Sequence, residues 1–176
     1  EDVFSLLDNL LKWTKSQIGN LNVVYQDIDV VEVVDSVIDV FNIVAGLKKI
    51  TIREEKPEKL PVCTDIDMLK TIIRNLLSNA IKFSNENSEV LVKMEEQGDT
   101  VVVSVKDSGC GIDEEGQQKL LHTDTHFSTF GTNNEEGSGL GLLLCQDFAV
   151  KSGGKLWFTS KKGEGSTFYF SIPLKK

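Results

Sequence analysis

Three polar residues near the middle of the chain have the spacing of one helical face. Asn75, Asn79 and Lys82 follow one another at intervals of four and three residues, so a helix places them on one side. Amide oxygens can ligate Mg²⁺, and an ammonium group can neutralise phosphate. The pattern therefore indicates a face that binds a metal and an anion. A solvated surface face is the alternative interpretation.

A second polar group, residues 107–112 (Asp-Ser-Gly-Cys-Gly-Ile), follows a run of alternating valines at 101–105. Asp107 continues that alternation, so we expect its carboxylate to point to the face that the valines bury. A carboxylate there needs hydrogen-bond partners, because an unpaired buried charge is costly. Gly109 and Gly111 would let another group approach the backbone closely. The alternative is a tight turn in which Asp107 bonds its own backbone.

A third feature is the glycine-rich run 137–141, Gly-Ser-Gly-Leu-Gly, which enters a predicted helix at 140–151. Glycines before a helix expose free N–H groups at its positive end, where a phosphate can bind. The run lacks the strand that precedes a dinucleotide-binding turn. It also lacks the Gly-Lys-Ser/Thr of a P-loop.

The spacing of apolar residues predicts the helices and strands that must position these polar residues. The best-defined helix spans 65–83, and Thr64 with Asp67 resembles a capping box at its start. Its apolar positions step by three and four residues and form one buried face. They are Ile66, Leu69, Ile73, Leu76, Ala80 and Phe83.

The other segments alternate between helices and strands. A second helix at 32–46 is expected to bury Val33, Val37, Val40, Phe41 and Val44, and residues 122–138 read as a long loop. Hairpins mixed with helical crossovers predict an α/β fold, a two-layer sandwich whose mixed sheet carries three long helices on one face. Further helices are predicted at 3–20 and 113–121, and strands at 24–30, 50–52, 61–63, 89–96, 100–106, 155–160 and 167–174.

Composition excludes several classes of protein. The 176 residues carry a net charge of −8, which argues against a nucleic-acid partner. No apolar run is long enough to span a membrane, and three widely spaced cysteines without a C-x-x-C pair disfavour a disulfide framework or zinc site. The start of the chain does not resemble a signal peptide and lacks Met, so we expect an excised fragment.

The motifs together resemble those of sensor histidine kinases, in that family's order and over nearly the whole chain. Residues 75–84 resemble the N box, 107–112 the first glycine box and 137–141 the second. Phe127-Ser128-Thr129 is similar to the phenylalanine box, and Gly165-Ser166-Thr167-Phe168 to the closing Gly-Thr-Phe segment. The stretch from Ser128 to Glu136 most resembles hybrid two-component sensors.

The resemblance implies the Bergerat ATP-binding fold, shared with gyrase, heat-shock chaperone and mismatch-repair ATPases. Asn79 and Asn75 would hold Mg²⁺, and Asn79 and Lys82 would serve catalysis. Asp107 would accept a hydrogen bond from the adenine amino group, and Ile112 would line the adenine pocket. Thr167 would support Asp107 or a bridging water. The ATP-binding residues that the resemblance implies are Asn75, Asn79, Lys82, Phe83, Asp107, Gly109, Gly111, Ile112, Phe127, Thr129, Gly137, Ser138, Gly139, Leu140, Gly141 and Thr167.

Two departures from the family pattern limit the reading. Neither His122 nor His126 is followed by an acidic residue as the family's phosphoacceptor is, so the chain should not phosphorylate itself. These histidines read as exposed rather than as a metal site. The long loop at 122–138, which we expect to act as a lid, contains no Lys or Arg, and Phe130 stands where hybrid sensors often place Lys. Transfer would then rely on Mg²⁺, Lys82 and backbone donors, or on Arg74.

The expected function is transfer of the ATP γ-phosphoryl group to a histidine on a dimerisation domain absent from this chain. Residues 1–20 would be the end of that domain's second helix, and 21–176 the catalytic domain. Expected partners are the dimerisation domain, a response-regulator receiver domain and a second copy in the full-length protein. The expected location is the cytoplasmic part of a membrane-anchored bacterial sensor. A hydrolytic ATPase and a silent ATP-binding regulatory module are the alternatives.

Overall fold

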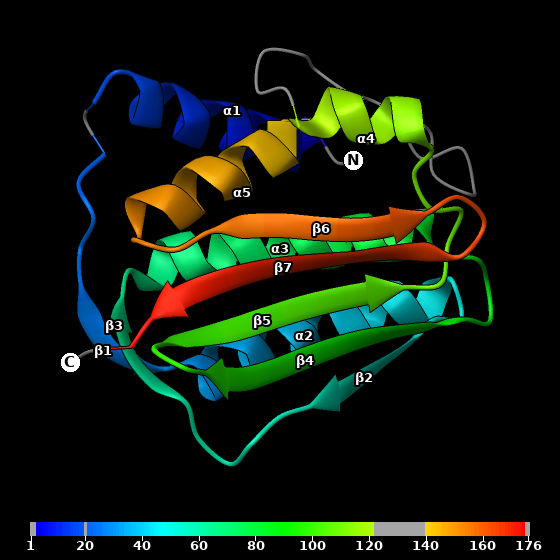
Figure 1. The fold of residues 1–176 in the computed structure, drawn as a ribbon, viewed down its shortest axis with the longest axis horizontal. Coiled ribbons are helices and arrows are strands. Elements are labelled where there is room, and N and C mark those ends of the chain that lie inside the picture. Colours follow the sequence, from blue (N-terminus) through cyan, green and yellow to red (C-terminus); the bar gives the residue numbers. More distant parts are fainter. Residues whose placement is uncertain (1–2, 20, 122–139, 175–176) are drawn as a thin grey trace.

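A five-stranded mixed sheet forms the centre of the computed structural model, which describes residues 3–19, 21–121 and 140–174 (Figure 1). The strand order is β2-β4-β5-β7-β6, in which β2 and β4 are parallel and the other pairs antiparallel. Two further strands, β1 and β3, form a separate antiparallel pair. The strands are β1 (Gln26–Asp29), β2 (Thr51–Glu55), β3 (Pro61–Thr64), β4 (Glu89–Gln97), β5 (Thr100–Asp107), β6 (Leu156–Lys161) and β7 (Gly165–Pro173).

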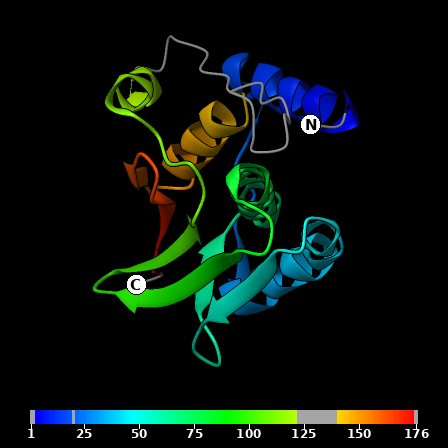
Figure 2. The ribbon, with the colours of Figure 1, turned by 90° about the vertical axis from the view of Figure 1, so that its right-hand side faces the viewer.

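Three long helices cover one face of the sheet, and the other face stays open (Figures 1 and 2). The two-layer sandwich and the predicted order of elements are confirmed. Another helix, α1, lies on α5, and α4 follows the loop after β5. No helix within the described ranges is long and apolar enough to cross a membrane. The helices are α1 (Val3–Gln17), α2 (Val30–Leu47), α3 (Ile66–Phe83), α4 (Glu114–Leu121) and α5 (Leu140–Lys151).

Helix α3 is the middle helix of the layer: it packs on the sheet, with α2 on one side and α5 on the other. Its predicted apolar face is buried at Leu69, Ile73, Leu76 and Ala80. It packs against inward-facing residues of β4, β5 and β7, because alternate residues of a strand point to the same side. The core residues from those strands are Val90, Val92, Met94, Val101, Val103, Val105, Phe170 and Ile172.

The predicted cap of this helix is wrong by one residue. Asp65, not Thr64, is the N-cap, and its Oδ1 accepts from the backbone N–H groups of Asp67 and Met68 at 2.9 and 3.1 Å. Thr64 is still extended, because it pairs with Gln26 as the last residue of β3. The first residue free to cap the helix is therefore Asp65.

The predicted apolar stripe of α2 is also partly wrong. Val33 and Val37 are buried as expected, but Val40 and Val44 are 63% and 48% exposed. The helix carries apolar residues around most of its circumference, so its pattern does not define which side packs. The structure buries the side that contacts α3 and β2, including Val34, Ile38 and Ala45.

Candidate functional site

The polar face of α3 is mostly buried. Asn75 and Lys82 are buried and Asn79 is partly exposed, so a solvated surface face is the wrong interpretation for the first two. The Asn75 side chain donates to the carbonyl oxygen of Thr71 at 2.9 Å and accepts from the side chain of Asn9 at 3.2 Å. Asn79 is therefore the more accessible of the two amides for a ligand.

A buried lysine at the C-cap of α2, Lys48, contacts the end of α3. Lys48 Nζ donates to the carbonyl oxygens of Ile81 and Lys82 at 3.1 and 2.8 Å. These carbonyls belong to the last helical turn, which carries partial negative charge and has no partners within the helix. Lys48 thus fixes the backbone that carries Lys82. Sequence reasoning missed this residue because the contact joins positions far apart in the chain.

Asp107 occupies the inner face of the sheet, as its alternation with the valines predicts. It is the last residue of β5, and Oδ1 accepts from the backbone N–H groups of Gly109 and Ser166 at 3.0 and 3.3 Å. The bond from Gly109 is the turn interaction that formed the alternative interpretation, so burial and turn coexist. No donor among the described residues bonds Oδ2. That oxygen is the one left to accept from a ligand.

Burial raises the pKa of Asp107 from its ordinary value of 3.8 to about 6, and the two backbone N–H groups offset only part of the rise. The carboxylate is consequently ionised at neutral pH, and burying its charge lowers the stability of the folded state. A buried acceptor with a perturbed pKa is a common property of binding sites.

The predicted support of Asp107 by Thr167 is wrong by one residue of register. Asp107 pairs with Ser166 across β5 and β7, and Lys106 pairs with Thr167. Paired residues share one face of a sheet, so Thr167 lies on the outer face, away from the Asp107 carboxylate. Ser166 takes the predicted role.

A small network extends from Ser166 to the first glycine box. The hydroxyl groups of Ser166 and Ser160 lie 2.8 Å apart, and Ser160 Oγ accepts from the N–H of Ile112, also at 2.8 Å. Gln117 of α4 then donates to the Ile112 carbonyl oxygen at 2.8 Å. These bonds fix the partly buried Ile112, the residue expected to line an adenine pocket. Ser160 and Gln117 carried no signal in the sequence.

Two glycines join the first glycine box to its neighbours. A Cβ on Gly109 would lie 1.9 Å from the carbonyl oxygen of Phe83, and one on Gly111 would lie 2.1 Å from that of Lys161. The group that approaches these glycines is therefore protein backbone rather than a ligand. The contact between Gly109 and Phe83 brings Asp107 next to the end of the α3 polar face.

The start of α5 meets the same face. Leu140 is buried, and a Cβ on Gly141 would lie 2.8 Å from Asn75 Oδ1. The structure thus brings together the end of the second glycine box, the N-box amides and Asp107. The remaining predicted residues Phe127, Thr129, Gly137, Ser138 and Gly139, together with His122, His126 and Phe130, lie outside the described residues.

The donor set suits Mg²⁺ held jointly by the protein and a nucleotide. No cluster of three His, Cys, Asp or Glu that could hold a metal exists in the described part of the chain. Mg²⁺ commonly uses few protein ligands together with substrate phosphates and water, so an amide oxygen beside a buried lysine is a fitting environment. Asn79, Asn75 and Lys82 are the residues that would hold the metal and the phosphates.

Comparison with known proteins identifies the relatives of this chain. Residues 64–176 match the model of the histidine kinase-, DNA gyrase B- and HSP90-like ATPase family. The adaptive-response sensory kinase SasA of Rippkaea orientalis is 30% identical over 171 residues, which are 96% of this chain and 43% of that protein. The sensor protein EvgS of Escherichia coli O157:H7 is 29% identical over 99% of this chain and 15% of its own length.

Solved structures agree with this assignment. The catalytic domain of histidine kinase ThkA superposes with a TM-score of 0.73 at 30% identity, covering 85% of this chain and 97% of that one. The Acinetobacter baumannii histidine kinase AdeS superposes with a TM-score of 0.78 at 20% identity, covering 97% and 78%. The chain spans less than half the length of the two curated relatives SasA and EvgS. It belongs to the family of histidine kinase-, DNA gyrase B- and HSP90-like ATPases, and within it to the catalytic ATPase domains of sensor histidine kinases.

Proposed function

We propose that this domain binds Mg-ATP and transfers the γ-phosphoryl group to a histidine on a separate dimerisation domain. One observation carries the proposal: the contact between Gly109 and Phe83 sets the buried acceptor Asp107 beside the end of the amide-bearing helix α3. An adenine ring and a triphosphate need an acceptor and a metal-binding face in that relation. The matched family model and the sensor kinase relatives support it.

Asp107 recognises the base. Its Oδ2 accepts a hydrogen bond from the adenine amino group, while Oδ1 stays bound to the N–H groups of Gly109 and Ser166. Ile112 lines the adenine pocket, held by Ser160. Because guanine carries a carbonyl oxygen at the position of that amino group, a carboxylate there discriminates against it.

The polar face of α3 binds the phosphates. The amide oxygens of Asn79 and Asn75 ligate Mg²⁺, which neutralises charge on the transferring phosphates when it is bound. The buried Lys82 contacts phosphate, and the N–H groups at the start of α5 supply further donors. This arrangement answers a problem set by the net charge of −8: an acidic protein must bind a polyanion with few cations.

Transfer requires a partner. The bond between the γ-phosphorus and the bridging oxygen breaks, and a bond from an imidazole nitrogen to that phosphorus forms. The imidazole proton passes to a base that the acceptor domain supplies. We propose residues 1–20 as the end of the second helix of such a domain and 21–176 as the catalytic unit. A receiver domain downstream, a homodimer of the full-length protein and a cytoplasmic position in a membrane-anchored sensor complete the proposal.

The test mixes this chain with a separately produced dimerisation domain and ATP labelled on the γ-phosphate. Acid-labile label on the histidine of that domain supports the proposal, and the matched control is the acceptor domain with that histidine changed to Gln. Release of free phosphate without labelling would make the chain a hydrolytic ATPase. Nucleotide binding with neither product would make it a regulatory module.

A further inference from the structure

Helix α1 docks on the catalytic unit through hydrogen bonds to α3. Asn9 Nδ2 donates to Asn75 Oδ1 at 3.2 Å, and Lys12 Nζ donates to Thr71 Oγ1 at 3.3 Å. Asn9 is buried, and its bond joins residues that are 66 positions apart. The contact therefore links the first helix directly to an N-box asparagine.

The same side of α1 also meets α5. Ser16 bonds the carboxylate of Asp147, and its carbonyl oxygen accepts from Lys151 at 3.1 Å. The two helices lie beside each other in both ribbon views (Figures 1 and 2). The opposite side of α1 is apolar, and Leu10 and Leu11 are 46% and 55% exposed. Helix α1 thus meets the catalytic unit with polar groups and with one large apolar side chain, Trp13, which packs against the core.

The carboxamide of Asn75 has hydrogen-bond partners at both its nitrogen and its oxygen, and the Cys145 thiol bonds it as well. Its Nδ2 donates to the Thr71 carbonyl oxygen, its Oδ1 accepts from Asn9, and the backbone of Gly141 approaches that same oxygen. Glycine at position 141 keeps that side of Oδ1 clear of a side chain, because a Cβ there would lie 2.8 Å from the oxygen. Asn9 occupies one of the two lone pairs through which Oδ1 can accept a hydrogen bond or ligate Mg²⁺.

A metal ion and the amide of Asn9 compete for the same oxygen, Asn75 Oδ1. Mg²⁺ binds an oxygen ligand at about 2.1 Å and holds its other ligands in an octahedron. The amide hydrogens of Asn9 carry partial positive charge and point at the same oxygen. Two positive partners on one amide oxygen repel each other, so each weakens the binding of the other.

We propose that Asn9 is a positioning residue that withholds Asn75 from Mg-nucleotide while α1 is docked. Mg-nucleotide then releases the docked helix, and docking of the helix weakens Mg-nucleotide binding by the same factor, because coupling between two binding events is reciprocal. The inference rests on the proposed function, in which Asn75 ligates the metal.

The first test measures affinity by calorimetry for a non-hydrolysable ATP analogue, with Mg²⁺ and with EDTA. Asn9→Ala removes one hydrogen bond to Asn75 and is expected to tighten binding about fivefold with Mg²⁺ and to leave binding in EDTA unchanged. The matched control is Gln17→Ala, which removes an exposed amide from the same helix. The double variant Asn9→Ala with Asn75→Ala should bind no more tightly than Asn75→Ala alone.

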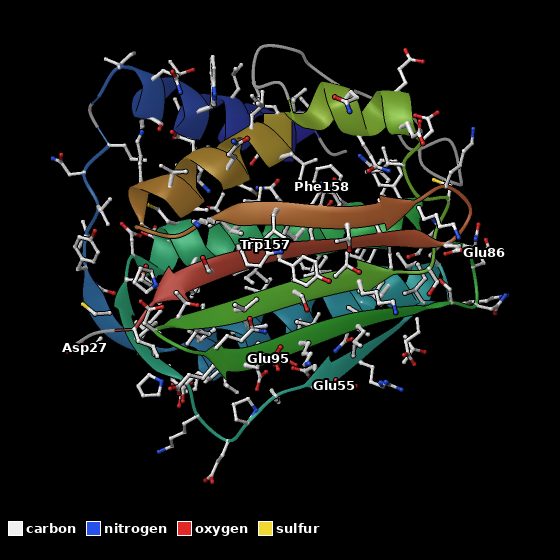
Figure 3. All side chains as sticks on the ribbon, in the orientation of Figure 1. Asp27, Glu55, Glu86, Glu95, Trp157 and Phe158 are labelled. Carbon is white, nitrogen blue, oxygen red and sulfur yellow. The ribbon has the colours of Figure 1, made fainter. Side chains whose placement is uncertain are left out.

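The second test measures whether α1 stays docked, by the fluorescence of a tryptophan on that helix. Trp13 on α1 packs against the core, and the other tryptophan, Trp157, stacks on Tyr169 on the open face of the sheet (Figure 3). In a Trp157→Phe background, fluorescence therefore follows Trp13 alone. The Mg-bound analogue should shift its emission to longer wavelength as α1 leaves, and the analogue in EDTA should not.

The outcomes separate the two proposals. If the parent binds the analogue but Asn9→Ala changes neither its Mg-dependent affinity nor the Trp13 response, the role of Asn9 is overturned and the proposed function stands. If the parent binds no nucleotide, both are overturned. An equal gain in affinity with and without Mg²⁺ would mean that α1 covers the nucleotide rather than the metal ligand, which also overturns the inference.

Discussion

Replacing Asp107 by Asn should stabilise the unliganded fold at neutral pH while it impairs adenine binding. Oδ1 accepts two backbone bonds, which the carbonyl oxygen of an asparagine also accepts. The substitution therefore keeps the turn and removes a buried negative charge. Burial holds the pKa of this carboxyl at about 6 in the folded protein, against the ordinary value of 3.8.

The size of the effect follows from that difference. At 1.36 kcal/mol per pKa unit, keeping Asp107 ionised costs the folded state about 3 kcal/mol at pH 7. Between pH 3.8 and about 6 the folded state binds more protons than the unfolded state, so this residue makes stability fall as pH rises through that window. The cost is fully present above it and absent below it. Asp107→Asn should therefore gain up to about 3 kcal/mol at pH 7, and nothing at pH 3.5.

The assay is urea unfolding of parent and variant at several values between pH 3.5 and 8, in which the difference between the two curves isolates this residue. Adenine affinity is measured beside it. The variant places an amide donor against the adenine amino donor, a mismatch of about 1–3 kcal/mol, which is roughly fivefold to 150-fold in affinity. A difference in stability that does not change with pH would refute the desolvation argument, and unchanged ATP affinity would refute the adenine role.

Three other substitutions test the site. Lys48→Met should cost about 2–4 kcal/mol in urea unfolding, because two helix-end carbonyls lose a charged donor, whereas the exposed neighbour Lys49→Met should cost little. Gly109→Ala should lower both the melting temperature and ATP affinity, because the added Cβ would lie 1.9 Å from the carbonyl oxygen of Phe83. The control Gly46→Ala, in α2, has open space around the added Cβ and should be neutral or stabilising. Asn79→Ala should weaken nucleotide binding with Mg²⁺ and leave binding in EDTA unchanged, as calorimetry would show.

Periodicity was sufficient to predict the scaffold of the site. Alternation along β5 placed Asp107 on the inner face, and the spacing along α3 placed Asn75 and Lys82 together. Both inferences depend only on residues that are near one another in the chain. The periods of the strand and the helix determine which face each side chain takes, so tertiary contacts do not change these assignments.

Periodicity could not predict contacts between residues that are far apart in the chain. The support of Asp107 was assigned to Thr167 instead of Ser166, because strand register is set by pairing and not by the motif. Asn9 contacts α3 from α1 and Lys48 from the C-cap of α2, and neither residue belongs to a motif. Only the packing of helices around α3 reveals them.

Helix α3 connects every part of the candidate site. Asp65 at its start accepts from the N–H of Val24 in the segment between α1 and β1 at 2.9 Å, while the carbonyl oxygen of Phe83 at its end touches Gly109. Eighteen helical residues span about 27 Å. Between those ends lies Asn75, which contacts α1. One capped and buried helix therefore joins the segment between α1 and β1 to the residues that would hold the adenine and the metal.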